Sequence, residues 1–125
     1  MEATLPWHYR ARVISGHGLG RKIGSPTLNL VLKDPHAPNG IFVGLVMIGQ
    51  HGYPAVVHVG PRPAIHDSRP VVEAHLLTTP PSGTLSVVRV MVLHRLRSVR
   101  MFATLPALRR QIQKDIALAR EWWRL

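Results

Sequence analysis

A glycine-rich stretch near the start of the chain carries the side chains best suited to hold a charged ligand. It combines Gly16, Gly18 and Gly20 with the adjacent cations Arg21 and Lys22. Glycine lets the backbone approach a ligand closely, and successive N–H groups in such a loop can form a cradle for an anion. Because two cations lie beside that cradle, the stretch predicts a binding site for phosphate groups.

Two side chains with neutral oxygens follow this loop. Pro26 disfavours a helical conformation in the residue before it, so a strand is predicted to begin here. On a strand, Thr27 and Asn29 point to the same side, because side chains alternate with a period of two. A hydroxyl and an amide oxygen beside bound phosphates suit a hard cation such as Mg²⁺. The loop matches neither the Walker pattern nor the dinucleotide fingerprint, so by itself it is equally consistent with an ordinary hairpin turn.

A general base would have to come from the acidic residues, of which the chain has 6. Only Glu73 interrupts an apolar run of strand character, the segment 71–77. A carboxylate buried there without a partner would be costly, and alternation puts Glu73 on the same face as His75. The residues alone leave two interpretations open, a functional carboxylate and a solvent-facing one on a one-sided sheet. They favour a structural role for His75 over direct catalysis.

The elements that position these residues are mostly strands. Alternating or apolar runs separated by Gly- and Pro-rich connections predict about six of them, near residues 7–13, 28–32, 41–48, 53–59, 71–77 and 85–93. Such spacing favours an antiparallel sheet, either closed into a barrel or folded as a sandwich.

A single helix is predicted after the last strand. Apolar residues recur every three or four positions and form one stripe, made of Leu105, Leu108, Ile112, Ile116, Ala119 and Trp123. Thr104 is placed to cap the helix, and Pro106 is tolerated in its first turn.

Composition indicates one domain of 125 residues with a net charge of +10 and no cysteine. A thiolate metal site and disulfides are therefore excluded. Because neither a signal peptide nor a membrane-length apolar run is apparent, we expect a cytoplasmic protein without membrane contact, and a monomer by default. The positive charge would favour either a polyphosphate substrate or a nucleic acid, but the scattered aromatic residues make nucleic-acid binding the less favoured interpretation.

The glycine-rich stretch and its continuation through Pro-Thr-x-Asn-Leu resemble the nucleotide-binding signature of riboflavin kinases. Further segments are similar to motifs of the same family and follow in its order: residues 38–44, 59–63, 72–77 and the region from Leu96 to Asp115. The resemblance runs from about Arg12 to Arg120. It is to the kinase domain of bacterial bifunctional riboflavin kinase/FMN adenylyltransferase, which we expect here as a stand-alone domain spanning residues 1–125.

The resemblance implies an all-β fold, a six-stranded antiparallel Greek-key barrel over about residues 7–95, with a terminal helix over about 104–123. It also implies transfer of the ATP γ-phosphate to the 5′-hydroxyl of riboflavin, giving FMN, with Mg²⁺. The implied site residues are Gly16, Gly18, Gly20, Arg21, Lys22, Thr27 and Asn29 for nucleotide, Thr27 and Asn29 for metal, Glu73 as general base, and Arg97 and Phe102 for flavin.

Two alternatives remain beside the kinase. One is a kinase-like barrel that binds flavin or nucleotide without turnover, favoured by the altered segment Arg97–Phe102 and opposed by the retained Thr27, Asn29 and Glu73. The other is a basic barrel that binds nucleic acid.

Overall fold

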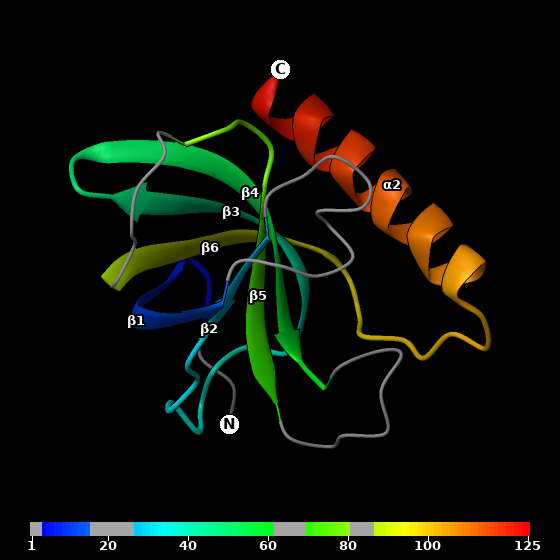
Figure 1. Cartoon of the computed structure of the whole chain (residues 1–125), viewed down its shortest axis with the longest axis horizontal. Helices are drawn as coiled ribbons and strands as arrows, with labels where there is room; N and C mark the ends of the chain where they lie inside the picture. Colours follow the sequence, from blue (N-terminus) through cyan, green and yellow to red (C-terminus); the bar gives the residue numbers. More distant parts are fainter. Residues whose placement is uncertain (1–3, 16–26, 62–69, 81–86) are drawn as a thin grey trace.

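A computed structural model describes residues 4–15, 27–61, 70–80 and 87–125 of the chain. Six antiparallel strands close into a barrel in the order β1-β2-β5-β4-β3-β6, and one helix follows (Figure 1). The elements are β1 (Trp7–Ser15), β2 (Thr27–Leu30), β3 (Gly40–Ile48), β4 (His51–Gly60), β5 (Val71–Leu76), β6 (Val87–Arg97) and α2 (Leu105–Trp123). The expected six-stranded barrel with a C-terminal helix is confirmed. The last strand reaches Arg97, beyond the expected end at residue 93.

The barrel interior is filled by alternate residues of every strand. On β1, the alternation predicted from Trp7 to Val13 is observed, with Trp7 and Ala11 buried and Tyr9 and Val13 packed against the same core. The rings of Trp7 and Tyr9 stack with their centroids 4.9 Å apart. Valines from four strands complete the interior, and this close-packed core makes the barrel wall a rigid support for side chains on its outer face.

Helix α2 covers part of the outer face, lying obliquely along one side of the barrel (Figure 1). A second apolar cluster joins the two, and its buried members are Ile41, Val43, Val56, Leu77 and Ala119. Arg120 adds a hydrogen bond of 2.9 Å from its guanidinium to the carbonyl of Leu77. No helix in the part of the chain that the structure describes is both long and apolar enough to cross a membrane.

The start of α2 agrees with the sequence prediction, but its buried face differs from the predicted apolar stripe at two residues. The hydroxyl of Thr104 accepts a hydrogen bond of 3.2 Å from the backbone N–H of Ala107, which caps the helix, and Pro106 lies in the first turn. Leu105, expected in the apolar stripe, is 46% exposed. Asp115 instead belongs to the buried face, with 2% exposure.

Asp115 is buried because Arg97 pairs with it. The guanidinium of Arg97 donates to both carboxylate oxygens, from Nε at 2.9 Å and from Nη2 at 2.8 Å. Gln111, one turn earlier on the helix, donates a third hydrogen bond of 3.0 Å to the same carboxylate. A bidentate arginine pair of this kind fixes geometry as well as charge, so it ties the end of β6 to the middle of α2.

The pair predicts an asymmetric response to mutation. Arg97→Ala leaves a buried carboxylate without its countercharge and should lower the free energy of unfolding by about 3 kcal/mol. Asp115→Ala should cost less, because the side chain of Arg97 is 20% exposed and can turn toward water. Urea unfolding measures both. Arg110→Ala, on the exposed face of the same helix, should change stability by no more than about 0.5 kcal/mol; equal losses in all three variants would contradict the prediction.

Candidate functional site

Two rows of side chains cross the outer face of the barrel at β2, β5 and β4. In the first, Asn29 lies opposite Glu73, and Glu73 lies opposite His58 on its other side. In the second, Thr27 lies opposite His75. Residues directly opposite in antiparallel strands point to the same face, and the residues between them belong to the barrel core. The strand register therefore brings these five polar side chains onto one patch of the outer surface.

Although this patch faces outward, most of it is shielded from solvent. Thr27 is 1% exposed, and Asn29, His58 and His75 are each below 10%. The side chain of Glu73 is more open, at 23%. A half-buried carboxylate among buried hydrogen-bonding groups is the environment in which proton transfer and charge recognition gain strength, because water screens them less.

His75 connects the two rows. Its Nδ1 is 3.0 Å from the hydroxyl of Thr27, and its Nε2 is 4.0 Å from a carboxylate oxygen of Glu73. Burial, reinforced by the neighbouring His58, lowers the pKa of His75 to about 4. His75 is therefore neutral at pH 7, and its contact with Glu73 is not an ion pair there.

His58 holds the end of β4. Its Nε2 is 2.7 Å from the carbonyl oxygen of Pro61, and since a carbonyl can only accept, Nε2 carries the hydrogen. Gly60, between them, has a φ of 137°, which turns the chain so that the carbonyl of Pro61 returns to the ring. Burial lowers the pKa of His58; the bond to Pro61 opposes this and the charge of Arg97 reinforces it.

The first row continues to the helix. Ile41 of β3 lies opposite His58 and also opposite Arg97 of β6. Three steps between neighbouring strands separate Glu73 from Arg97, roughly 14 Å along the surface. The guanidinium carbon of Arg97 lies 5.9 Å from the ring centroid of Phe102, and Arg100 covers the same ring at 4.9 Å. The row thus joins a carboxylate at one end to a cation and an aromatic ring at the other.

The structure brings together two sets of the residues singled out in the sequence. Thr27, Asn29 and Glu73 form the first set, and Arg97 and Phe102 form the second. The residues expected to hold phosphates, which are Gly16, Gly18, Gly20, Arg21 and Lys22, lie outside the described part of the chain, so their role stays a prediction.

Sequence reasoning missed two residues of this surface, His58 and Asp115. His58 interrupts an apolar strand at an outward position, the same signal that singled out Glu73. Asp115 falls within the helical stripe, between Ile112 and Ala119, where a lone carboxylate indicates a buried partner. Both signals were present in the sequence.

A magnesium ion would be compatible with the chemistry of Thr27 and Asn29. Among the described residues there is no group of three or more His, Cys, Asp or Glu side chains that could hold a metal on their own. Mg²⁺ commonly binds through few protein oxygens and takes its remaining ligands from substrate phosphates and water. A hydroxyl and an amide oxygen two residues apart on one strand fit that pattern.

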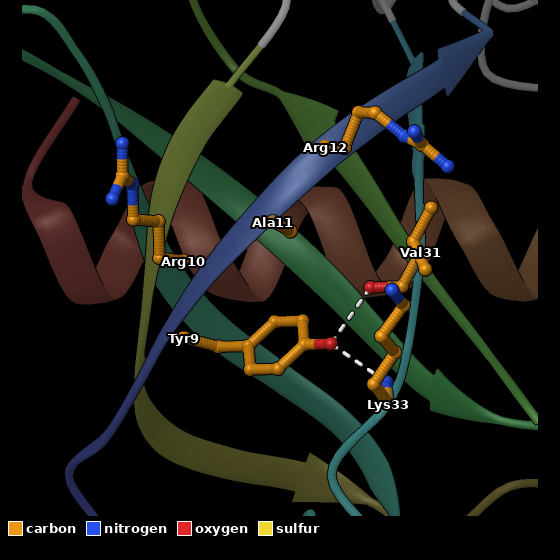
Figure 2. A pocket seen from close by; sticks show the side chains of 6 residues that line it. All are labelled: Tyr9, Arg10, Ala11, Arg12, Val31 and Lys33. Carbon is orange, nitrogen blue, oxygen red and sulfur yellow. Dashed lines mark hydrogen bonds between the residues drawn. The ribbon is translucent and has the colours of Figure 1, made fainter.

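A pocket of about 210 Å³ opens elsewhere, where β1 diverges from the segment after β2 (Figure 2). The hydroxyl of Tyr9 bridges the gap, donating to the carbonyl of Val31 at 2.8 Å and accepting from the backbone N–H of Lys33 at 2.7 Å. Arg10 and Arg12 extend away from the tyrosine ring on opposite sides (Figure 2). Their side chains point in different directions rather than toward one another.

Comparison with known proteins identifies the family. The profile of the family Flavokinase, described as riboflavin kinase, matches residues 3–123. The chain belongs to the riboflavin kinase family. Bifunctional riboflavin kinase/FMN adenylyltransferases are similar to it, with 33% identity over 122 residues for the Escherichia coli K12 protein and 35% over 119 residues for that of Pseudomonas fluorescens. These matches cover 96% and 92% of the chain but only 39% and 38% of the relatives.

Solved structures agree with the fold of this riboflavin kinase family member. A Streptococcus pneumoniae protein described as a macrolide-efflux protein superposes with a TM-score of 0.75 at 29% identity, over 94% of this chain and 39% of the other. Riboflavin kinase from Trypanosoma brucei gives a TM-score of 0.61 at 23% identity, over 98% of this chain and 82% of its own. At 23% identity, the match to the Trypanosoma brucei protein shows a shared fold.

The lowered pKa of His58 predicts that the protein loses stability in mild acid. Below the ordinary pKa of 6.5 the unfolded chain takes up a proton that folded His58 resists, so the free energy of unfolding should fall as the pH drops through this range. His58→Gln should make the decline shallower, whereas His51→Gln, exposed on the same strand, should keep the slope of the parent. Urea unfolding between pH 7 and pH 4.5 measures the slopes, and identical slopes in parent and His58→Gln would contradict the prediction.

Proposed function

We propose that this chain transfers the γ-phosphate of ATP to the 5′-hydroxyl of riboflavin, giving FMN and ADP. The observation that carries the proposal is the register of β2 against β5, with Asn29 opposite Glu73 on the outer face of a riboflavin kinase family barrel. Phosphoryl transfer requires a site for the metal and polyphosphate next to a positioned acceptor hydroxyl, and these two side chains meet that requirement from adjacent strands.

Glu73 acts as the general base. Its carboxylate takes the proton of the 5′-hydroxyl while that oxygen forms a bond to the γ-phosphorus. The bond from the γ-phosphorus to the bridging oxygen breaks, and its electron pair leaves with ADP. The position of Glu73 supports this role, because its carboxylate is partly accessible and lies 4.0 Å from His75, a histidine that is neutral at pH 7.

Thr27 and Asn29 hold Mg²⁺ in this proposal, and the ion neutralises charge on the phosphates. The contact between Thr27 and His75 supports the part of Thr27. With the hydrogen of neutral His75 on Nε2, toward the carboxylate of Glu73, Nδ1 accepts the hydroxyl hydrogen of Thr27. This bond orients the hydroxyl oxygen of Thr27. The loop with Gly16, Gly18, Gly20, Arg21 and Lys22 is proposed to bind the phosphates.

The flavin ring is proposed to lie at the other end of the row, near Arg97 and Phe102. The guanidinium of Arg97 is committed to Asp115 and to the carbonyl of Ser98, so it contributes a fixed edge of the flavin site. Phe102 is half-buried beneath Arg97 and Arg100 and offers an aromatic surface. The separation of this end from Glu73 leaves room for the chain that links a flavin ring to its terminal hydroxyl.

The two alternatives receive less support. Binding without turnover would not require an acid beside the metal ligands, and Glu73 occupies that position. Nucleic-acid binding would use aromatic rings on an open sheet surface, but Trp7 is buried in the barrel core and Tyr9 stacks on it, packed against that core.

Purified protein incubated with riboflavin, ATP and Mg²⁺ should form FMN, detected by chromatography. Glu73→Gln should lower kcat by about 100-fold or more, because the amide cannot take the proton. The same substitution at the exposed Glu121 on α2 is the matched control and should leave kcat unchanged. A folded parent protein that forms no FMN would overturn the kinase assignment, and normal turnover by Glu73→Gln would remove Glu73 from the role of base.

The metal assignment predicts a change in the magnesium requirement. Asn29→Ala removes one oxygen ligand and should raise the Mg²⁺ concentration needed for half-maximal FMN formation by about tenfold or more, with saturating riboflavin. Asn29→Asp keeps an oxygen at the same place and should lie closer to the parent. Magnesium titrations of the reaction rate compare the three proteins, and an unchanged magnesium midpoint in Asn29→Ala would contradict a ligand role.

A further inference from the structure

His75 lies where the polar patch on the barrel meets the apolar cluster that attaches helix α2. On β5 it is directly opposite Thr27 of β2 on one side and Val56 of β4 on the other. Val56 is a buried member of the cluster that contains Ala119 of the helix. The imidazole therefore borders the packed interface with the helix, which agrees with its exposure of only 6% on an outer face.

The imidazole makes a polar contact at this position. An apolar side chain would extend the cluster around Val56 without the free-energy cost of burying a polar ring. Instead, Nδ1 of His75 lies 3.0 Å from the hydroxyl oxygen of Thr27, in a buried hydrogen bond between side chains 48 positions apart. Because a threonine hydroxyl rotates to suit its partners, a ring that is held in place by burial selects one direction for it.

We propose that His75 is a positioning residue for the metal site, which acts by fixing the hydroxyl of Thr27 through Nδ1. The inference rests on the proposed function, in which Thr27 and Asn29 hold Mg²⁺ beside the phosphates. His75 does not bind the ion in this arrangement. It sets the orientation of one of the two side chains that do. Hydrogen-bonding partners of metal ligands commonly act in this way, and their loss lowers metal affinity by about 10- to 100-fold.

The neutral state of the ring suits a place beside a cation site. Burial, reinforced by His58, lowers the pKa of His75 to about 4, so the imidazole adds no positive charge near the proposed ion at pH 7. A lysine or arginine could also bind the hydroxyl but would repel a divalent cation. The other ring nitrogen, Nε2, is 4.0 Å from a carboxylate oxygen of Glu73, which favours the hydrogen on Nε2 and makes Nδ1 the acceptor for Thr27.

Two substitutions at His75 separate this role from a merely structural one. In His75→Asn the amide group comes near the place of Nδ1, so it keeps a hydrogen-bonding partner for Thr27. In His75→Gln the longer side chain carries its amide toward the place of Nε2, so the contact with Thr27 is lost. Val56→Ala, directly opposite His75 and 2% exposed, is the destabilising control, since it weakens the cluster under the helix without removing a hydrogen bond.

The experiment measures the dissociation constant of ADP by calorimetry, once with saturating Mg²⁺ and once with EDTA, and the ratio of the two values is the magnesium enhancement. We expect an enhancement of at least about tenfold in the parent. His75→Gln should weaken ADP binding about fivefold or more with Mg²⁺ and by no more than about twofold with EDTA. His75→Asn and Val56→Ala should keep the enhancement within about twofold of the parent, although Val56→Ala lowers the unfolding temperature.

A double-substitution cycle tests whether His75 acts through Thr27. Thr27→Val removes the hydroxyl and should reduce the magnesium enhancement at least as much as His75→Gln does. Because the contact no longer exists in Thr27→Val, adding His75→Gln should change the enhancement by less than about twofold, whereas independent effects would multiply. Thermal unfolding of each variant establishes that it is folded.

Four results would overturn the inference. They are a parent that binds ADP equally with Mg²⁺ and with EDTA, a His75→Gln variant that keeps the enhancement, a folded His75→Asn or Val56→Ala variant that loses as much of it, and losses from Thr27→Val and His75→Gln that multiply. The first uses the protein without substitution, so the inference can fail even where no variant folds. A parent that forms FMN yet shows one of these results leaves the kinase assignment standing, whereas a parent that neither binds ADP nor forms FMN refutes both.

Discussion

The antiparallel ladder between β2 and β5 is the constraint on which the whole site depends. It pairs Asn29 with Glu73 and Thr27 with His75, so residues more than forty positions apart in the chain meet on one patch. A shift of one residue in this register would turn Glu73 into the barrel core and Val72 or Ala74 outward. Burial of the apolar residues on β2 and β5 therefore fixes the register of the two strands, and that register also aligns the polar side chains of the site.

The outer face of a barrel normally contacts solvent, but here part of it is buried deeply enough to shift the pKa of its side chains. His58 and His75 are buried on that face, and both have lowered pKa values with burial as the main cause. Two neutral imidazoles beside Glu73 provide hydrogen-bonding capacity without adding positive charge. Asp115, by contrast, has an arginine charge directly against it. The same barrel surface thus holds one carboxylate beside two buried histidines and a second one in a bidentate pair with an arginine.

Much of this arrangement could be predicted from the sequence, because apolar alternation reports which strands exist and which way their side chains point. Glu73 stood out since it is a charge in an apolar strand, and its partners Thr27 and Asn29 were adjacent to a recognisable loop. What the sequence did not show was the order of strands around the barrel. Knowing that β5 lies between β2 and β4 is what turns His58 from an isolated histidine into a neighbour of Glu73. The partner of Asp115 likewise could not be identified without knowing that Arg97, at the end of an unexpectedly long β6, faces the helix.

The two ends of the row are held by different physical means, and this affects how they can vary. The end with Thr27, Asn29 and Glu73 is fixed by backbone ladders on both sides of β5, which no single side chain controls. The end with Arg97 depends on α2, which is attached by an apolar cluster and by the bidentate pair with Asp115. Changes in helix packing would therefore move the proposed flavin end while leaving the carboxylate and metal ligands in place. His58 lies on the rigid side of this boundary, since β4 holds its backbone and the carbonyl of Pro61 holds its ring, so the ring keeps a constant position relative to Glu73 whatever the helix does.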